Sequence, residues 1–194
     1  VVDLVVQLLS DHKDISPSLL SLAGVNPSYI LGATVYGPLK LSGQDYVGGI
    51  TGRGNGAYIT SSSVDYLNKV SYWRNKIYDT ASVQKKDVEL TGVQSITGKN
   101  FVGGIAGSLG TAKVAGLLND TLGLASYLGF TVDKVTVTGP ANGLSITGEQ
   151  RIGGGVGEAI GGLVTAVTIK NLQSVTGINR IGGMIGLAGP GDLA

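Results

Sequence analysis

Aliphatic, polar and glycine positions recur in a fixed order within a twelve-residue block that occurs four times in the chain. The four copies are LSGQDYVGGITG from Leu41, ITGKNFVGGIAG from Ile96, ITGEQRIGGGVG from Ile146 and VTGINRIGGMIG from Val175. Positions one and seven are aliphatic in every copy. They have the same parity, as expected for side chains on one face of an extended backbone. The block therefore predicts short β-strands.

The aliphatic residue after the glycine pair breaks this parity. It is Ile50 in the first copy, Ile105 in the second and Met184 in the fourth. Two residues without a Cβ allow the chain to turn a corner, so that the segments on both sides direct their apolar residues inward. The predicted corners are Gly48, Gly49, Gly103, Gly104, Gly153, Gly154, Gly182 and Gly183.

Alternating segments before most blocks, at residues 88–90, 135–138 and 167–169, predict further strands. Coils of two or three short strands that are joined by glycine corners and stacked on one another form a parallel β-solenoid. We therefore expect a mainly β protein, built as a parallel β-solenoid-like stack of coils with Gly-Gly corners.

The block spacing predicts insertions into this stack. The blocks start 55, 50 and 29 residues apart (96 − 41, 146 − 96 and 175 − 146). Relative to a bare coil of 29 residues, the first two intervals carry 26 and 21 additional residues (55 − 29 and 50 − 29). We expect a single repeat domain over 1–194, with a cap or assembly segment at 1–33 and a solenoid at 34–194 that has insertions at about 61–87 and 108–130.

Two segments have helical patterns. Ser16 is a candidate N-cap for a short helix that has Pro17 in its first turn and ends at Gly24. Residues 111–128 place apolar side chains close to one helical face, which predicts a helical insertion. The apolar run 1–9 is compatible with a strand or a helix and is a candidate for capping the stack or pairing with another subunit.

Composition excludes several classes of function. Hydrophobic residues make up 42% of the chain, which argues against disorder. Charged residues make up only 14% and the net charge is +1, so nucleic acid is not an expected partner. The 33 glycines accompany only five prolines and follow no Gly-X-Y period, so they indicate turns rather than collagen. There is no cysteine for a disulfide or a thiolate zinc site.

No membrane-spanning or secretory segment is expected from the sequence. The longest apolar stretch, at 114–130, contains Asn119 and Asp120 and is too polar to cross a bilayer. The chain begins with Val1 and has no charged and apolar leader, so we expect a processed form or a fragment of a longer protein.

Residues 47–63, VGGITGRGNGAYITSSS, resemble the GLUG motif, in which an aliphatic-Gly-Gly-aliphatic-x-Gly core precedes a polar turn and an Ile-x-x-Ser strand. This motif occurs in tandem in large secreted bacterial surface proteins and adhesins, so the resemblance implies a β-solenoid stalk at a cell surface. It covers the four blocks and the residues that follow them. Two copies depart from the motif: Gly155 replaces the aliphatic residue in the third, and neither the third nor the fourth precedes an Ile-x-x-Ser strand.

The chain offers little for catalysis. His12 is the only histidine and lies in a charged loop, so a Ser-His-Asp triad and a histidine-based metal site are not expected. The glycine clusters at 52–56 and 153–157 are interpreted as corners rather than phosphate loops. Four carboxylates flank an aromatic segment and keep a carbohydrate-cleaving enzyme as an alternative: Asp65, Asp79, Asp87 and Glu89.

Aromatic side chains in the first insertion are the candidate ligand-binding residues. They are Tyr66, Tyr72, Trp73 and Tyr78. Aromatic faces offer apolar area with polar edges, which suits sugar rings. The alternative is that they pack the insertion against the solenoid.

Two further block positions predict columns of side chains if the coils stack in register. The fifth position is a candidate hydrogen-bonded ladder of Asp45, Asn100, Gln150 and Asn179. The sixth predicts an outward ridge that changes from aromatic to basic: Tyr46, Phe101, Arg151 and Arg180.

These patterns favour a non-enzymatic extracellular protein of a microbial surface, structural or adhesive, with self-assembly into a filament as one form. Its expected partners are its own copies or other surface proteins, with glycans as a further candidate, and no cofactor or metal is expected. The alternative is a carbohydrate-binding or carbohydrate-cleaving module that uses the aromatic insertion. An ice or mineral binder is not favoured because Thr136, Thr138, Thr165 and Thr168 do not recur regularly.

Overall fold

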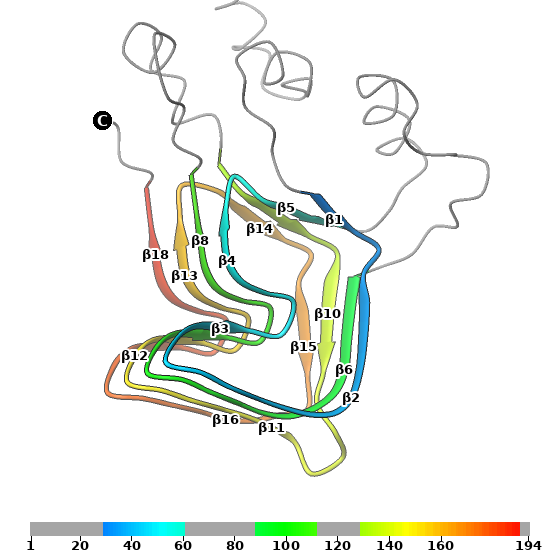
Figure 1. The fold of residues 1–194 in the computed structure, drawn as a ribbon. Helices are drawn as coiled ribbons and strands as arrows, with labels where there is room; N and C mark the ends of the chain where they lie inside the picture. The colour runs from blue at the N-terminus through cyan, green and yellow to red at the C-terminus, as the bar shows by residue number, and fades with distance from the viewer. Residues whose placement is uncertain (1–28, 61–87, 112–128, 191–194) are drawn as a thin grey trace, which may run out of the picture.

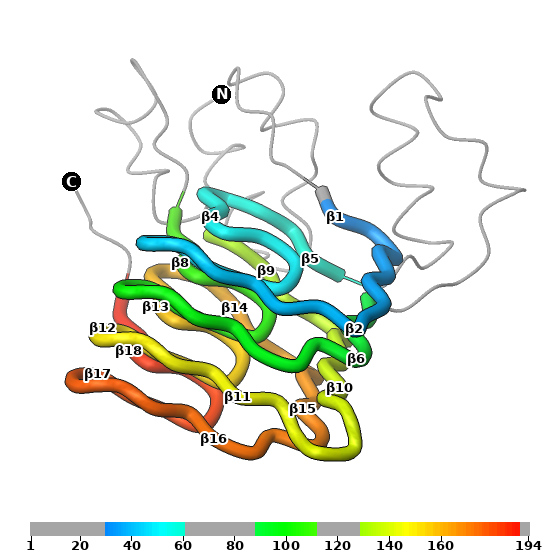
Figure 2. The backbone as a smooth tube through the Cα atoms, turned by 60° about the horizontal axis from the view of Figure 1, so that its bottom comes forward, coloured from blue at the N-terminus to red at the C-terminus, as the bar shows by residue number. Residues whose placement is uncertain are grey.

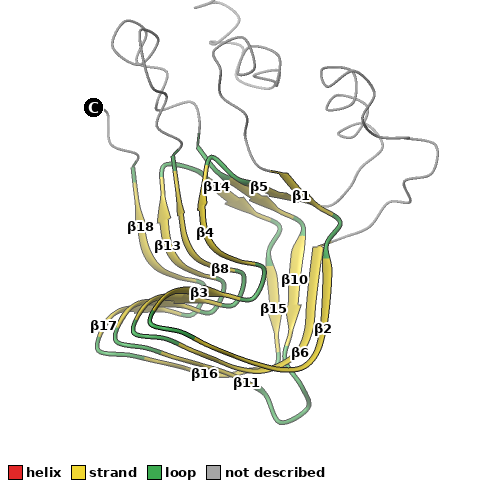
Figure 3. Ribbon diagram, in the orientation of Figure 1, coloured by secondary structure: helices red, strands yellow, loops and turns green. Residues whose placement is uncertain are grey.

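Every regular element of the described chain is a β-strand. The computed structural model describes residues 29–60, 88–111 and 129–190. It contains 18 strands and no helix within these ranges (Figure 3). The prediction of a mainly β protein is therefore confirmed. The predicted helices at 16–24 and 111–128 and the apolar run 1–9 lie outside the described residues.

The strands form four sheets, and all of the strand pairs within them are parallel. Sheet A contains β1 (Tyr29–Leu31), β5 (Tyr58–Thr60), β9 (Thr131–Asp133) and β14 (Leu163–Thr165). Sheet B contains β2 (Thr34–Ser42), β6 (Val88–Thr97), β10 (Val135–Thr138), β11 (Leu144–Thr147), β15 (Thr168–Lys170) and β16 (Leu172–Thr176). Sheet C contains β3 (Asp45–Gly48), β7 (Asn100–Gly103), β12 (Gln150–Gly153) and β17 (Asn179–Gly182). Sheet D contains β4 (Thr51–Asn55), β8 (Ala106–Gly110), β13 (Val156–Ile160) and β18 (Ile185–Gly189).

The chain passes through the sheets repeatedly in the order B, C, D, A (Figure 1). We call β2–β5 coil one, β6–β9 coil two, β10–β14 coil three and β15–β18 coil four, and β1 precedes coil one in sheet A. Figure 2 shows the coils stacked in chain order, from coil one in blue and cyan to coil four in orange and red. The fold is thus solenoid-like, with parallel strands in stacked sheets.

Equivalent positions of the repeated block lie opposite one another in the ladder. Val47 pairs with Val102, Val102 with Ile152, and Ile152 with Ile181. Coils three and four are offset by 29 residues at Gln150 and Asn179 (179 − 150). Parallel, in-register pairing places like residues above one another, so each block position becomes a column along the stack.

The two longer intervals between blocks carry most of their additional residues next to strands of sheet A. Residues 61–87 lie between β5 and β6, and residues 111–130 lie between β8 and β9, since β8 extends to Gly110. The offset between coils two and three is 47 residues at Val88 (135 − 88) but 50 at Ser95 (145 − 95). Three of the 21 additional residues therefore lie in the turn between β10 and β11.

The core is the apolar interior enclosed by the sheets. Ile96, Val102, Ile146 and Ile152 of the two middle coils are completely buried. Burial of each such side chain stabilises the fold by about 1.5–3 kcal/mol. In coil four, by contrast, Ile181 remains 44% exposed because no described coil follows it.

The glycine pairs lie between sheets C and D, where the chain changes direction. At this corner the amide of Gly49 donates to the carbonyl oxygen of Gly104, and the amide of Gly104 donates to that of Gly154. A Cβ on Gly104 would lie 2.2 Å from the carbonyl oxygen of Gly154. Glycine is thus required here because the next coil approaches so closely.

Candidate functional site

The outer side of the corner between sheets C and D carries the most developed side-chain cluster of the described chain. The sixth block position contributes what we call the aromatic-basic column: Tyr46, Phe101, Arg151 and Arg180. These residues belong to β3, β7, β12 and β17, one from each coil. Sheet D supplies Arg53, Ser108 and Glu158, which share one register position on β4, β8 and β13.

A left-handed backbone at the sixth position builds this column. The φ angles of Tyr46, Phe101, Arg151 and Arg180 are 57°, 55°, 57° and 55°. The ladder pairs the fifth and seventh positions across coils, for example Asp45 with Asn100 and Val47 with Val102. Such a backbone costs a non-glycine residue on the order of 1–2 kcal/mol. All four coils share this conformation, so it is part of the corner geometry and not an isolated irregularity.

The column is held together by contacts between π faces and guanidinium groups. The rings of Tyr46 and Phe101 stack with centroids 4.6 Å apart and an interplanar angle of 15°. The Arg151 guanidinium lies 4.5 Å from the centroid of Phe101, and that of Arg53 lies 5.1 Å from the centroid of Tyr46. Phe101 is therefore in contact with both coil one and coil three.

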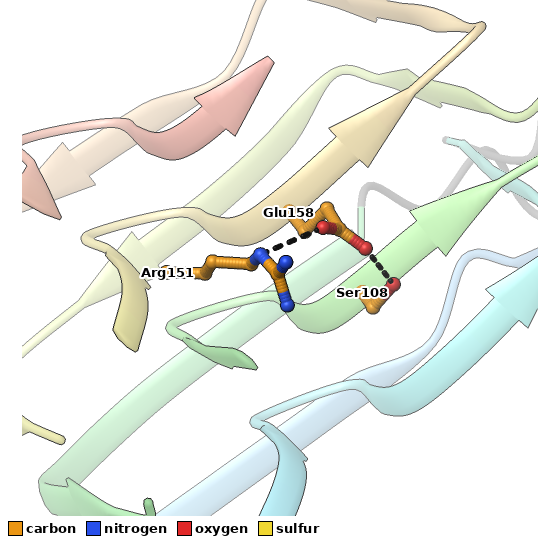
Figure 4. Close-up of polar contacts among 3 residues, drawn as sticks. All are labelled: Ser108, Arg151 and Glu158. Atoms are coloured by element: carbon orange, nitrogen blue, oxygen red, sulfur yellow. Dashed lines mark hydrogen bonds and ion pairs between the residues drawn. The ribbon is translucent and has the colours of Figure 1, made fainter. Parts of the chain in front are cut away.

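Glu158 connects the column to sheet D (Figure 4). Its Oε2 lies 3.1 Å from Arg151 Nε, and its Oε1 accepts a hydrogen bond of 3.2 Å from the Ser108 hydroxyl. Arg151 Nε is buried and lacks an aligned hydrogen-bond partner, so its contact with Glu158 is an ion pair without hydrogen-bond geometry. Both side chains are partly buried, which reduces solvent screening of the pair. The carboxylate thus contacts Arg151 of its own coil and Ser108 of coil two.

The fifth block position forms the column that its spacing predicts. Asp45, Asn100, Gln150 and Asn179 lie in one register line across sheet C. Asn100 Nδ2 donates to Asp45 Oδ1 over 2.7 Å. This hydrogen bond links coils one and two at the surface.

A column of hydroxyl groups was missed in the sequence. Ser42, Thr97, Thr147 and Thr176 share a register line in sheet B, and all four are exposed. The repeated block could have predicted this column, because its second position is always Ser or Thr. The threonines named above as candidates for ice or mineral binding are less regular: Thr136 pairs with Thr168, but Glu89 occupies the same line in coil two.

The candidate ligand-binding residues Tyr66, Tyr72, Trp73 and Tyr78 lie outside the described residues, as do Asp65, Asp79, Asp87 and His12. Of the four carboxylates considered for catalysis, only Glu89 is described. It is half-buried on β6. The predicted grouping of ligand-binding and catalytic residues therefore stays a prediction from the sequence.

Within the described ranges, no three or more His, Cys, Asp and Glu residues gather in a way that would hold a metal ion. The same part of the chain contains no helix with the length and apolar character needed to cross a bilayer.

Comparison of the chain with protein-family models, curated proteins and solved structures gave no match. The resemblance to the GLUG motif thus stays a prediction from the residues of the repeated block.

Proposed function

We propose that this protein is a non-enzymatic structural or adhesive protein of a microbial cell surface. In this role a parallel β-solenoid acts as a rigid spacer that presents repeated columns of side chains outside the cell. The observation that carries the proposal is the register: four coils place equivalent residues of the block in straight columns. A surface that repeats from coil to coil can bind a partner that also has a repeating structure, because each coil can make the same contact.

The low charge and the surface chemistry support this role. Fourteen basic residues oppose thirteen acidic ones. The best-defined polar cluster, Arg151 with Glu158 and Ser108, joins coils two and three to each other. Its groups are engaged with one another, as expected for side chains that stabilise the stack.

Self-association is the second part of the proposal. In sheets B, C and D the strands of the first and last described coils are the sheet edges. Unpaired edges template pairing with another chain unless they are capped. Stacked coils also expose apolar side chains at the end, as Ile181 shows. A surface protein that extends by stacking would use both features.

Two measurements on the purified chain test this function. Light scattering with size-exclusion chromatography over a concentration series should detect association, and electron microscopy should show elongated particles. Binding to intact microbial surfaces and to glycan arrays tests adhesion. A protein that stays monomeric and binds no surface would contradict the proposal.

A carbohydrate-binding or carbohydrate-cleaving module is the second candidate. It is favoured by the clustering of Tyr66, Tyr72, Trp73 and Tyr78 with acidic residues in one segment. The rings of Tyr46 and Phe101 are poorer candidates, because each covers a face of the other. Glycan binding that survives Trp73→Ala would exclude the aromatic segment, and release of reducing ends from a polysaccharide would establish an enzyme.

A further inference from the structure

We propose that the Asn142–Gly143 pair, in the turn between β10 and β11, is a site of spontaneous deamidation in the folded protein. The side-chain amide of Asn142 is converted into a carboxylate, partly in an isoaspartyl linkage. The modification needs neither a partner nor an enzyme, so it is independent of the proposed function.

The turn that carries this pair is an addition to coil three. It comprises residues 139–143, between the end of β10 at Thr138 and the start of β11 at Leu144. In coils one and two, β2 and β6 continue through this position, and in coil four only Asn171 separates β15 from β16. The turn projects from the stack at the bottom of Figure 1. Its residues belong to no strand pair.

The reacting groups lie together in this turn. Asn142 is exposed, and its side chain makes no hydrogen bond with another described residue. The amide of Gly143 donates to the carbonyl oxygen of Pro140 over 2.8 Å, which closes a β-turn. The attacking nitrogen and the attacked Cγ belong to neighbouring residues, so a rotation of the Asn142 side chain and backbone is enough to bring them into contact.

Glycine is required after Asn142. Gly143 has a φ of +89°, and a Cβ there would lie 2.5 Å from the Cβ of Gln173 in coil four. A residue without a side chain does not shield its own nitrogen from a neighbouring carbonyl carbon. Residues with large side chains instead follow Asn100, Asn171 and Asn179. The fold therefore places the least hindered nucleophile beside an exposed asparagine.

The reaction is an attack of the Gly143 nitrogen on Cγ of Asn142. The nitrogen loses its proton to solvent and forms a bond to Cγ, while the bond from Cγ to Nδ2 breaks and Nδ2 leaves as ammonia after taking up a proton. Water then opens the cyclic imide. Opening at Cγ gives aspartate, and opening at the backbone carbonyl carbon gives isoaspartate. No oxidation state changes, and water is the only co-reactant.

Little of the fold has to open for this attack. The hydrogen bond from Gly143 to Pro140 is the restraint on the attacking nitrogen, and it lies within the turn. The amides of Gly139 and Leu144 at the base of the turn donate to carbonyl oxygens of coil four, and these bonds can stay intact. A segment that opens by losing one local hydrogen bond does so without global unfolding. Deamidation therefore proceeds in the native stack.

The other Asn-Gly pair of the sequence, Asn55–Gly56, is protected by the fold. Asn55 is exposed, but it pairs with Gly110 in sheet D. Gly56 is buried, and its amide donates to the carbonyl oxygen of Gly110 over 2.8 Å. Opening at this position breaks a contact between coils one and two. The same dipeptide therefore reacts at two rates in one protein.

Deamidation changes the charge of the protein while the stack is retained. Conversion of Asn142 lowers the formal net charge from +1 to zero. Isoaspartate also lengthens the backbone by the side-chain methylene, but the turn belongs to no strand pair, so the ladder on both sides is kept. The stored protein becomes a mixture of charge forms that share one fold.

Peptide mass mapping of the incubated native protein tests the site. In mildly alkaline buffer, Asn142 should exchange its amide for a carboxylate at least about tenfold faster than Asn55, because only the latter needs coils to separate. In concentrated urea the two asparagines should react at similar rates. Equal rates in the native protein would overturn the inference, as would an Asn142 that stays intact there over the time in which it reacts in urea.

Two matched variants extend the test to charge. Asn142→Gln keeps an uncharged amide but forms the larger ring slowly, so the acidic form seen by ion exchange should disappear. Asn55→Gln is the control and should leave that form unchanged. An acidic form that accumulates equally in Asn142→Gln would overturn the inference.

Asn142→Asp tests whether the fold accepts the product. Its circular dichroism and urea midpoint should match those of the original chain, because residue 142 is exposed and lies outside the ladder. A lowered midpoint would contradict deamidation within an intact stack.

Discussion

A glycine of the corner is required by its neighbouring coil rather than by its own backbone. Gly49, Gly104 and Gly154 have φ angles outside the left-handed region, yet each leaves no space for a Cβ against the coil that follows. The sixth block position shows the reverse: Tyr46 and Arg151 adopt a left-handed backbone although neither is glycine, and their side chains contact those of the aromatic-basic column and sheet D. Residue type in the block therefore reports on stacking contacts as well as on local conformation.

The contrast between two equivalent glycines is testable. Gly104→Ala should lower the free energy of unfolding by about 1–3 kcal/mol, because its Cβ would overlap a backbone carbonyl that cannot move without shifting coil three. Gly183→Ala, measured at a concentration where the chain is monomeric, should leave it unchanged. Urea unfolding followed by circular dichroism checks both, and equal losses in the two variants would contradict this account.

Ionisation of Tyr58 is expected to lower the stability of the fold at high pH. Burial raises the pKa of its hydroxyl above the ordinary value. The unfolded chain releases this proton near pH 10, while the folded chain retains it to higher pH, so the stabilisation is complete below about pH 10. It is lost as the pH rises through the folded pKa. Tyr58→Phe should remove this part of the decline in urea midpoint between pH 8 and 11, since the other tyrosines contribute equally to both proteins. Parallel pH profiles would contradict the prediction.

At the scale of elements, neighbouring coils are joined by surface columns in addition to the ladder and the core. Phe101 of β7 contacts Tyr46 of β3 on one side and Arg151 of β12 on the other. Glu158 of β13 adds an ion pair with Arg151 and a hydrogen bond with Ser108 of β8. These contacts all lie at the junction of sheets C and D. Side chains therefore stabilise this corner on its solvent-facing side, and the aliphatic core packs on its inner side.

Phe101→Ala tests how much the contacts of the aromatic-basic column stabilise the stack. The aromatic pair and the cation–π contact together suggest a loss of about 1–2.5 kcal/mol. Arg180→Ala is the matched control: it has the same block position and the same backbone conformation, but its side chain is exposed in coil four. Its cost in dilute solution should stay below about 0.5 kcal/mol. Similar costs for both variants, measured by chemical denaturation, would show that the column does not stabilise the stack.

At the scale of the whole molecule, burial is uneven along the stack. The completely buried aliphatic side chains belong largely to coils two and three, whereas Leu163 on the edge strand β14 of sheet A and Ile181 in coil four are 55% and 44% exposed. In a solenoid each coil contacts only its neighbours, so stability is close to a sum of coil and interface contributions. The last described coil has one interface fewer than the middle coils.

Hydrogen exchange measures this gradient. In the dilute monomer, amides of β16, β17 and β18 should exchange faster than those of β6, β7 and β12, because coil four opens by breaking a single interface. Mass spectrometry after pepsin digestion resolves these strands. Uniform protection across all coils would indicate a fully cooperative stack and contradict the expected fraying.

Much of the architecture could be predicted from the repeated block. Two aliphatic positions of equal parity, a glycine pair and an apolar residue of opposite parity are sufficient to predict strands that meet at a corner. The 29-residue interval then predicts the register, because equal coils stack with like residues opposite one another. The polar line of Asp45, Asn100, Gln150 and Asn179 follows directly from that register.

Other features could not be predicted, for identifiable reasons. Each coil passes through four sheets rather than the expected two or three strands, because short strands such as β4 (Thr51–Asn55) are rich in glycine and carry no hydrophobic alternation. The sequence also did not show that the 21 additional residues are divided between the β8–β9 connection and the β10–β11 turn. Only the register shows this, because Val88 pairs with Val135 at an offset of 47 residues and Ser95 pairs with Ser145 at an offset of 50. The predicted sugar-binding aromatics at 66–78 stay a prediction.

The sequence by itself determined the repeat, the mainly β class and the core-facing positions of the strands with aliphatic alternation, because these depend on period and parity within a few residues. Only the tertiary structure decided that the sixth position adopts a left-handed backbone, that Arg151 meets Glu158 and Phe101, and that a Cβ on Gly183 would meet no atom of the described residues within 4 Å. The contact between Arg151 and Phe101 and the surroundings of Gly183 depend on how coils pack whose equivalent residues are 29 to 55 apart in the chain. They arise only when the coils are packed against one another.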